Sequence, residues 1–104
     1  MVLKDLEEFE EARDLLRKAL AADEKSFAPG HPSIAICQSN LALVLKDVGE
    51  LAEARDLMRK AYGTFLGRFG AGHPTTKIFR RNLEVMRVDP ETGLVRERGD
   101  GAAG

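Results

Sequence analysis

Ser33 to Phe69 reads SIAICQSNLALVLKDVGELAEARDLMRKAYGTFLGRF, and this stretch decides the fold. Apolar residues recur at three- and four-residue spacing on both sides of Gly49, which indicates two amphipathic helices joined by a tight turn. We predict the first helix from Pro32 or Ser33 to about Asp47 and the second from about Leu51 to Phe69. The residues expected on the two buried faces are Ile34, Cys37, Leu41, Val44, Leu45 and Val48, then Leu51, Ala54, Leu57, Met58, Ala61 and Phe65.

The same pattern extends in both directions at a fixed step of 42 residues. Glu11 to Leu15 recurs as Glu53 to Leu57, and Gly30-His31-Pro32 recurs as Gly72-His73-Pro74, so both offsets, from 11 to 53 and from 30 to 72, are 42. A fixed period of this size indicates a stacked array of repeats, in which each unit buries its apolar face against its neighbours. We therefore expect a binding scaffold.

The upstream segment, Met1 to Phe27, matches the second half of a repeat. Gly49 ends the first helix of the hairpin because glycine adopts the left-handed conformation without penalty, but the equivalent upstream position is Glu7. The sequence leaves two interpretations here: either a turn near Glu7 separates two helices, or one unbroken helix runs through the segment.

Downstream, we expect Thr75 or Thr76 to cap a last helix that runs to about Met86. The repeat then stops, because the segment from Asp89 onward carries no further helix pattern. We predict a helical repeat domain over residues 1–88 and a mostly unstructured, flexible C-terminal tail over residues 89–104. The predicted fold class is all-α, an α-solenoid of antiparallel helical hairpins with about two repeats.

Composition excludes several classes of function. The 104 residues give room for one domain, and a formal net charge of −1 gives no electrostatic case for nucleic acid. No apolar run approaches the roughly 18 residues of a membrane span, and the start lacks a signal-peptide pattern. The single cysteine, Cys37, excludes an internal disulfide and fits a reducing compartment, so we expect a cytoplasmic location without membrane contact.

Chemistry beyond binding finds little support in the sequence. His31 and His73 occupy equivalent loops one repeat apart with no cluster of carboxylates nearby, so we expect them to pack the loops and not to bind a metal. Cys37 lies on the apolar side of its helix, where thiols are usually inert, and we do not expect it to act as a nucleophile with His31 as its base. We predict no enzymatic activity, no cofactor and no metal.

The chain resembles the tetratricopeptide repeat family. The residues that carry the resemblance are the first-helix Leu41-Ala42 and Leu45, the turn Gly49, and the small Ala54 and Ala61. The step of 42 residues exceeds the family's usual repeat of about 34, and together with the Gly-His-Pro loop it resembles the kinesin light chain type. The sequence departs from the family pattern at Gln38, where a large apolar or aromatic residue is common.

The resemblance implies a module that binds a peptide or a partner helix on the concave surface lined by the first helix of each repeat. Asn40 and Asn82 match an asparagine that commonly hydrogen-bonds a bound peptide, although they could instead brace neighbouring helices. Arg81 with its neighbouring lysines favours a carboxylate or an acidic segment. The expected binding residues are Ile36, Ser39, Asn40, Leu43, Lys46, Lys77, Ile78, Arg81, Asn82 and Val85.

An assembly role is the second interpretation. Repeat units cannot bury their faces alone, and about three are normally needed for stability. We expect the truncated first helix and the unpartnered last helix to leave two apolar edges, near Phe9 and Phe79, that self-association into a homo-oligomer covers. A third interpretation, implied by the resemblance, is a fragment of a larger repeat-containing regulator, since such arrays often accompany catalytic domains in family members. The sequence does not establish whether Met1 is a natural start.

Overall fold

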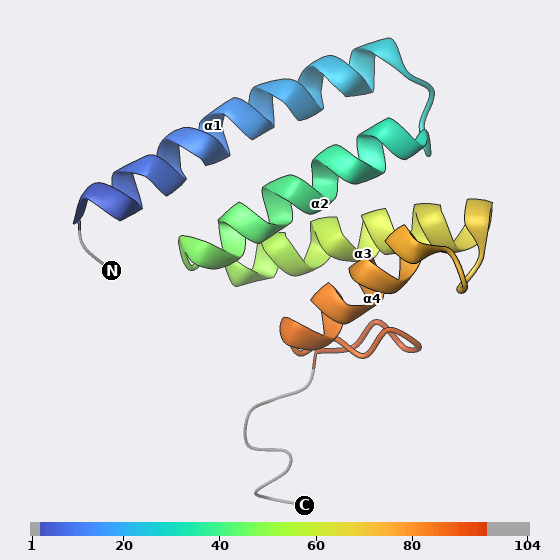
Figure 1. Ribbon diagram of the computed structural model, residues 1–104. Coiled ribbons are helices and arrows are strands. Elements are labelled where there is room, and N and C mark those ends of the chain that lie inside the picture. Colours follow the sequence, from blue (N-terminus) through green and yellow to red (C-terminus); the bar gives the residue numbers. More distant parts are fainter. Residues whose placement is uncertain (1–2, 96–104) are drawn as a thin grey trace, which may run out of the picture.

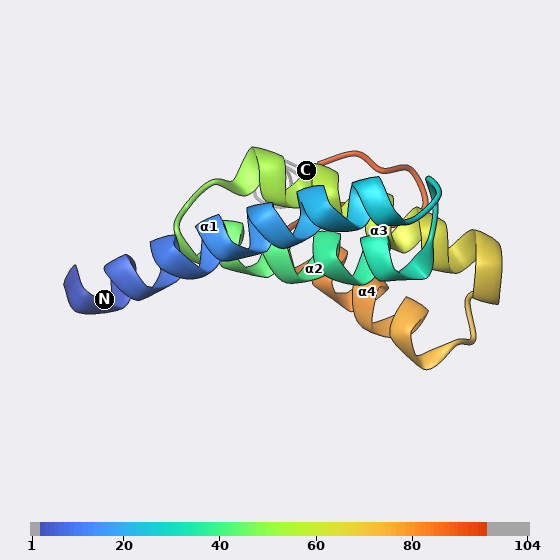
Figure 2. The same cartoon turned by 90° about the horizontal axis from the view of Figure 1, so that it is seen from above.

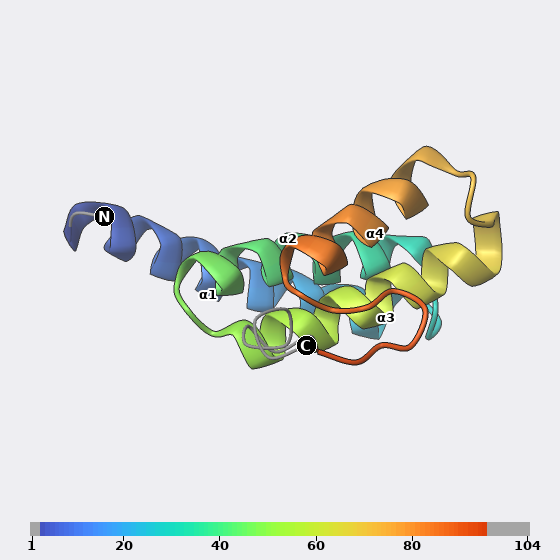
Figure 3. The ribbon, with the colours of Figure 1, turned by 90° about the horizontal axis from the view of Figure 1, so that it is seen from below.

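The computed structural model describes residues 3–95, with side chains from residue 7 onward. In this part of the chain four helices follow one another (Figure 1): α1 (Leu3–Ser26), α2 (Pro32–Asp47), α3 (Leu51–Phe69) and α4 (Pro74–Val85). Each packs against the next, and α2 and α4 lie toward one side of the molecule with α3 toward the other (Figures 2 and 3). The all-α solenoid is confirmed.

α1 is one unbroken helix from Leu3, which decides between the two interpretations of the upstream segment. The turn between α2 and α3 explains why. Gly49 has φ +91, a left-handed conformation that costs side-chain-bearing residues roughly 1–2 kcal/mol. Glu7 occupies the equivalent place and would bear that cost in a turn, so the helix continues through it.

The core lies between α2, α3 and the inner face of α4. Leu41, Leu45, Met58 and Leu83 are each at most 1% exposed. Fully buried alanines, Ala42, Ala54 and Ala61, stand among these larger side chains and let the helix axes approach closely. The expectation that Leu51 is buried is wrong, because this first residue of α3 is 38% exposed.

In both Gly-His-Pro loops the histidine side chain caps the helix that follows, a role that the sequence pattern did not predict. The Nδ1 atoms of His31 and His73 accept hydrogen bonds from the backbone N–H groups of Ser33, at 3.0 Å, and Thr75, at 3.1 Å. Histidine is therefore the N-cap of α2 and of α4, each followed by proline at the first helical position. The expected cap at Thr75 or Thr76 is wrong; both threonines lie inside α4.

A turn follows α4, and Val88 and Val95 pair across it in an antiparallel bridge. Asp89 N–H donates to the Leu94 carbonyl at 2.8 Å, and Gly93 N–H donates to the Asp89 carbonyl at 2.7 Å. The expectation of an unstructured segment therefore does not hold for residues 89–95. Residues 96–104, the rest of the expected tail, lie outside the described part of the chain.

Two arginines of α3 hold this turn against the helices. Arg55 Nε donates to the Met86 carbonyl at 2.8 Å, and Arg59 Nε donates to the Gly93 carbonyl at 2.9 Å. Val88 is 1% exposed and belongs to the core cluster. The turn thus packs against α3 and α4, at the position where the second helix of a further repeat would begin.

The two ends of the array differ, and the expectation that Phe79 lies at an exposed apolar edge is wrong. At the α4 end, Phe79 is 4% exposed and so belongs to the core, not to an edge. The outward positions of α4 carry the exposed charges Lys77 and Glu84, and Arg87 is exposed in the turn that follows. At the α1 end, Phe9 is half-buried, but Leu15 is 66% exposed, so this end presents apolar surface.

Candidate functional site

Exposed apolar residues recur at equivalent positions of α2 and α4. Ile36 is 46% exposed and Ile78, one 42-residue step later, is 56% exposed. Seven residues further along each helix, Leu43 is half-buried and Val85 is 61% exposed. Residues seven positions apart share one helix face. Ile78 and Val85 therefore form an exposed apolar pair on α4, whereas in α2 Ile36 is exposed and Leu43 packs partly against the core.

The two asparagines stand between these apolar residues. Asn40 is exposed and Asn82 is half-buried. In the part of the chain that the structure describes, neither side-chain amide makes a hydrogen bond. Their donors and acceptors are therefore available to a ligand, which is not what a bracing role between helices would require.

Cationic side chains flank the same surface. Lys77 and Arg81 are exposed on α4, and Lys46 is half-buried in the last turn of α2. No ion pair engages them among residues 7–95. Their charges are therefore not neutralised by neighbouring carboxylates, and they can attract an acidic group.

Ser39 does not belong to this surface. Its side chain is 4% exposed, and its hydroxyl donates to the Ile36 carbonyl at 2.8 Å within α2. A buried hydroxyl that is already bonded to its own helix cannot contact a ligand. The expectation that Ser39 faces the concave surface is wrong; the other nine expected residues are at least partly exposed.

A hollow of about 350 Å³ lies beside these residues, between α1 and α2. It brings Ile36 and Asn40 together with side chains of α1 that the sequence analysis did not include. The signal that could have identified them is the repeat step, because Ala19 of α1 is equivalent to the core residue Ala61 of α3. The lining residues are Leu16, Ala19, Asp23, Ser33, Ile36, Cys37 and Asn40.

Cys37 forms part of the wall of this hollow and is buried. Its thiol donates to the Leu16 carbonyl across the helix pair at 3.8 Å. Burial, followed by the nearby charges of Asp23 and Glu24, raises the pKa of the Cys37 thiol. All three effects disfavour the thiolate, which is the reactive form.

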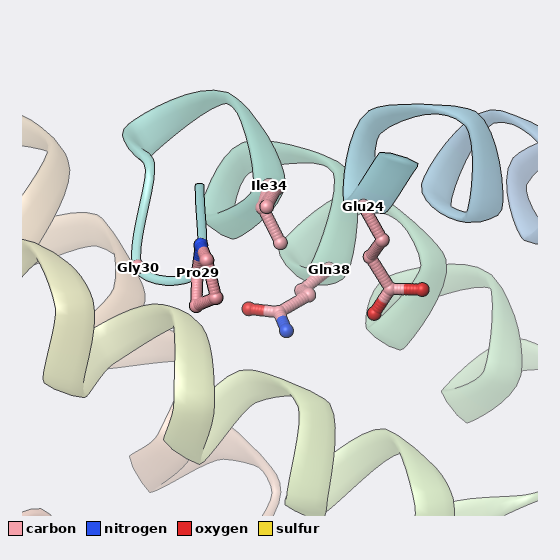
Figure 4. Close-up of a pocket in the computed structure, with 5 residues that line it drawn as sticks. All are labelled: Glu24, Pro29, Gly30, Ile34 and Gln38. Carbon is pink, nitrogen blue, oxygen red and sulfur yellow. The ribbon is translucent and has the colours of Figure 1, made fainter. Parts of the chain in front are cut away.

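A second hollow, of about 280 Å³, lies where α1, the first Gly-His-Pro loop and α2 meet (Figure 4). Glu24, Pro29, Gly30, Ile34 and Gln38 line it, and the Gln38 amide extends toward Pro29 in this view. None of the expected binding residues reaches it. Gln38 is the residue that departs from the family pattern, and here it contributes a polar group to the hollow's wall.

Ion pairs fix the position of α1 relative to α3. Arg17 donates to both oxygens of the Glu53 carboxylate, at 2.6 and 2.8 Å. These hydrogen bonds are the main reason that the pKa of Glu53 lies below its ordinary value and that of Arg17 above it. Exposed pairs contribute only about 0.2–1 kcal/mol, so this pair orients α1 more than it stabilises the fold.

Comparison with known proteins identifies the family. The model of the tetratricopeptide repeat matches residues 1–66 of the 104. The chain belongs to the tetratricopeptide repeat family. A search of curated proteins finds no match to it. Tetratricopeptide repeats generally mediate protein–protein interactions and are generally non-enzymatic, so the exposed surface of α2 and α4 is a candidate interaction surface.

The described part of the chain contains neither a metal-binding cluster nor a membrane-spanning helix. Between residues 3 and 95, no three His, Cys, Asp or Glu side chains come together in a way that could hold a metal ion. Within that range no helix is long and apolar enough to cross a membrane. The Nδ1 atom of each histidine accepts a backbone hydrogen bond.

Proposed function

We propose that this chain is a non-enzymatic interaction module that binds an extended peptide or a partner helix on the concave surface formed by α2 and α4. The observation that carries the proposal is the recurrence of an exposed isoleucine, Ile36 and Ile78, one step apart in a repeat protein. Burying these exposed isoleucines in a complex would remove apolar surface from water and so lower the free energy. Exposed apolar side chains at equivalent positions therefore indicate an interaction surface.

The polar groups define the chemistry of the ligand. The Asn40 and Asn82 amides each offer a donor and an acceptor to the backbone of an extended chain. Arg81 and Lys77, exposed and without ion-pair partners among the described residues, favour an aspartate, a glutamate or a terminal carboxylate. The ligand we expect is therefore a peptide with apolar side chains and at least one acidic group.

Two finer assignments belong to this proposal. We infer that the repeats are of the long kinesin light chain type, since the Gly-His-Pro loops, their histidine caps and the starts of α2 and α4 all recur at the step of 42 residues. We place the protein in the cytoplasm, because the lone, buried Cys37 fits a reducing compartment.

A displayed library of short peptides, with and without acidic residues, tests the function. We expect acidic, apolar peptides to be enriched, and their affinity to fall on the order of tenfold or more in the Asn40→Ala, Asn82→Ala double variant. Ile78→Glu should have the same effect, because a charge would replace exposed apolar surface that the ligand covers. Titration calorimetry on the enriched peptides gives the affinities.

Leu66→Glu is the matched control. Leu66 is 40% exposed, but it lies on α3, outside the proposed surface. We expect this variant to bind as the wild type does and circular dichroism to show unchanged helicity in all three variants. Undiminished binding by the double asparagine variant and by Ile78→Glu would refute the concave surface as the site.

A further inference from the structure

α1 and α3 are equivalent helices of the repeat, but within residues 3–95 only α3 is covered by a neighbouring helix on both of its sides. Leu57 and Ala61 of α3 are 8% and 0% exposed. Their equivalents in α1 lie on the surface: Leu15 is 66% exposed, and Ala19 is exposed as well. In Figure 1, α1 forms the outer edge of the molecule, with α2 on one side only. The open face of α1 therefore carries the residue pattern of a buried face.

The structure shows what covers such a face inside the molecule. α2 packs on α3, and its small residues Ala35 and Ala42, together with Leu45, lie in one core cluster with Leu57 and Ala61. These alanines are seven residues apart, so they fall on one face of α2. Small residues at this spacing let a helix lie close against the leucine and alanine of its neighbour.

The hollow between α1 and α2 extends the open face. Three residues that line the hollow, Leu16, Ala19 and Cys37, are equivalent at the 42-residue step to Met58, Ala61 and Phe79. These three equivalents are all at most 4% exposed. The equivalent space between α3 and α4 is filled, with Phe79 in the place of Cys37, whereas the space between α1 and α2 is hollow. A helix that packs on α1 as α2 packs on α3 would lie against α1 beside this hollow.

Repeat equivalence sets the direction of the added helix, which lies antiparallel to α1 as α2 lies antiparallel to α3 (Figure 1). Asp23 and Glu24 in the last turns of α1 already lie beside the first turns of α2, whose N-terminal dipole they complement. The last turn of the added helix then lies near Glu11, which is exposed and favours a lysine or arginine, as α2 has in Lys46.

We propose that the open face of α1, beside the hollow, binds an amphipathic helix of α2's type, supplied by a partner protein. The partner helix runs antiparallel to α1, carries small residues seven positions apart with a leucine three positions after the second, and has a basic last turn. Binding it adds a helix to the N-terminal end of the array.

This surface adjoins the proposed concave site, because Ile36 and Asn40 of that site line the hollow, but Leu15 belongs only to the face of α1 and Ile78 only to the concave site. Ile78 remains 56% exposed although α2 is seated against α3, so a helix seated on α1 would leave Ile36 similarly available. Substitutions at Leu15 therefore report on the partner helix, and substitutions at Ile78 report on the peptide. Either proposal can fail without the other.

The probe is a labelled peptide with the sequence of Pro32–Asp47, with Cys37→Ser and a lactam bridge on its outer face that keeps it helical. We expect saturable binding to the full chain by fluorescence anisotropy, weakened on the order of tenfold or more by Leu15→Glu, because the charge would be buried without a partner. Ala42→Glu in the peptide should weaken binding equally. Leu94→Glu is the control, because Leu94 is 69% exposed on the C-terminal turn.

Two results would overturn the proposal. One is the absence of saturable binding, or binding that Leu15→Glu and the peptide's Ala42→Glu leave unchanged. The other is a wild-type chain that light scattering shows as a dimer and that Leu15→Glu converts to a monomer, because a second copy would then occupy the face. Since Leu15 is largely exposed, circular dichroism should show the same helicity in Leu15→Glu as in the wild type.

Discussion

At the scale of single residues, each loop histidine does two jobs at once. His31 caps α2 and stacks on Phe27, with ring centroids 4.2 Å apart, and His73 caps α4 and lies 4.8 Å from Phe69. In each cap the Nδ1 atom is the acceptor of the backbone hydrogen bond. Sequence reasoning missed this role because the usual caps are serine, threonine, aspartate and asparagine, and threonines stood nearby.

His31→Ala should lower the free energy of unfolding by about 0.5–2 kcal/mol, the usual cost of a lost N-cap, and His73→Ala by a similar amount. His31→Asn should cost less than His31→Ala, because the asparagine oxygen can accept the same backbone hydrogen bond. Urea unfolding followed by circular dichroism measures the difference. Equal losses for the alanine and asparagine variants would show that the ring contact with Phe27, not the cap, matters.

At the scale of elements, local signals determined most boundaries. α3 begins at Leu51 and ends at Phe69 as predicted, because Gly49 precedes it and Gly70, with φ +83, follows it. α2 begins at Pro32, which fits the first helical position. α1 is continuous because Glu7 stands at the position where the other repeat has the turn glycine Gly49. The sequence pattern alone could not decide whether a turn or a helix forms at Glu7.

The C-terminal turn could not be predicted from its own residues. Its Asp89-Pro90-Glu91-Thr92-Gly93 run is polar and signals only a turn. What orders it are hydrogen bonds from Arg55 and Arg59, more than 30 residues earlier in the chain, and the burial of Val88. Such long-range contacts leave no periodic pattern in the segment itself.

Val88→Ala should therefore destabilise the whole domain by about 1–3 kcal/mol, as expected when a buried side chain loses two methyl groups. It should also speed amide exchange at Asp89 and Gly93, whose N–H groups form the turn. Leu94→Ala, at a 69% exposed position of the same turn, should change stability by about 0.5 kcal/mol or less. Equal effects of the two substitutions would mean that the turn does not contribute to the core.

At the scale of the whole molecule, the array has one closed end and one open end. Nine of the ten expected binding residues reach the surface because repeat register predicts helix faces well. The difference between the ends was harder to foresee, because it depends on what is absent beside each face. α4 replaces the buried Ala35 and Ala42 of α2 with the exposed charges Lys77 and Glu84, and terminal repeats need such a polar outer face.

If these charges close the end, removing them should open it. The Lys77→Ala, Glu84→Ala variant restores the alanines of α2, so the outer face of α4 should accept the open face of α1 from another copy. Such a head-to-tail contact does not close on itself and propagates. We expect the average mass from light scattering to rise with concentration more steeply than for the wild type, and Leu15→Glu added to the variant to abolish the rise. An unchanged mass would mean that the Val88–Val95 turn, and not the charge on α4, closes this end.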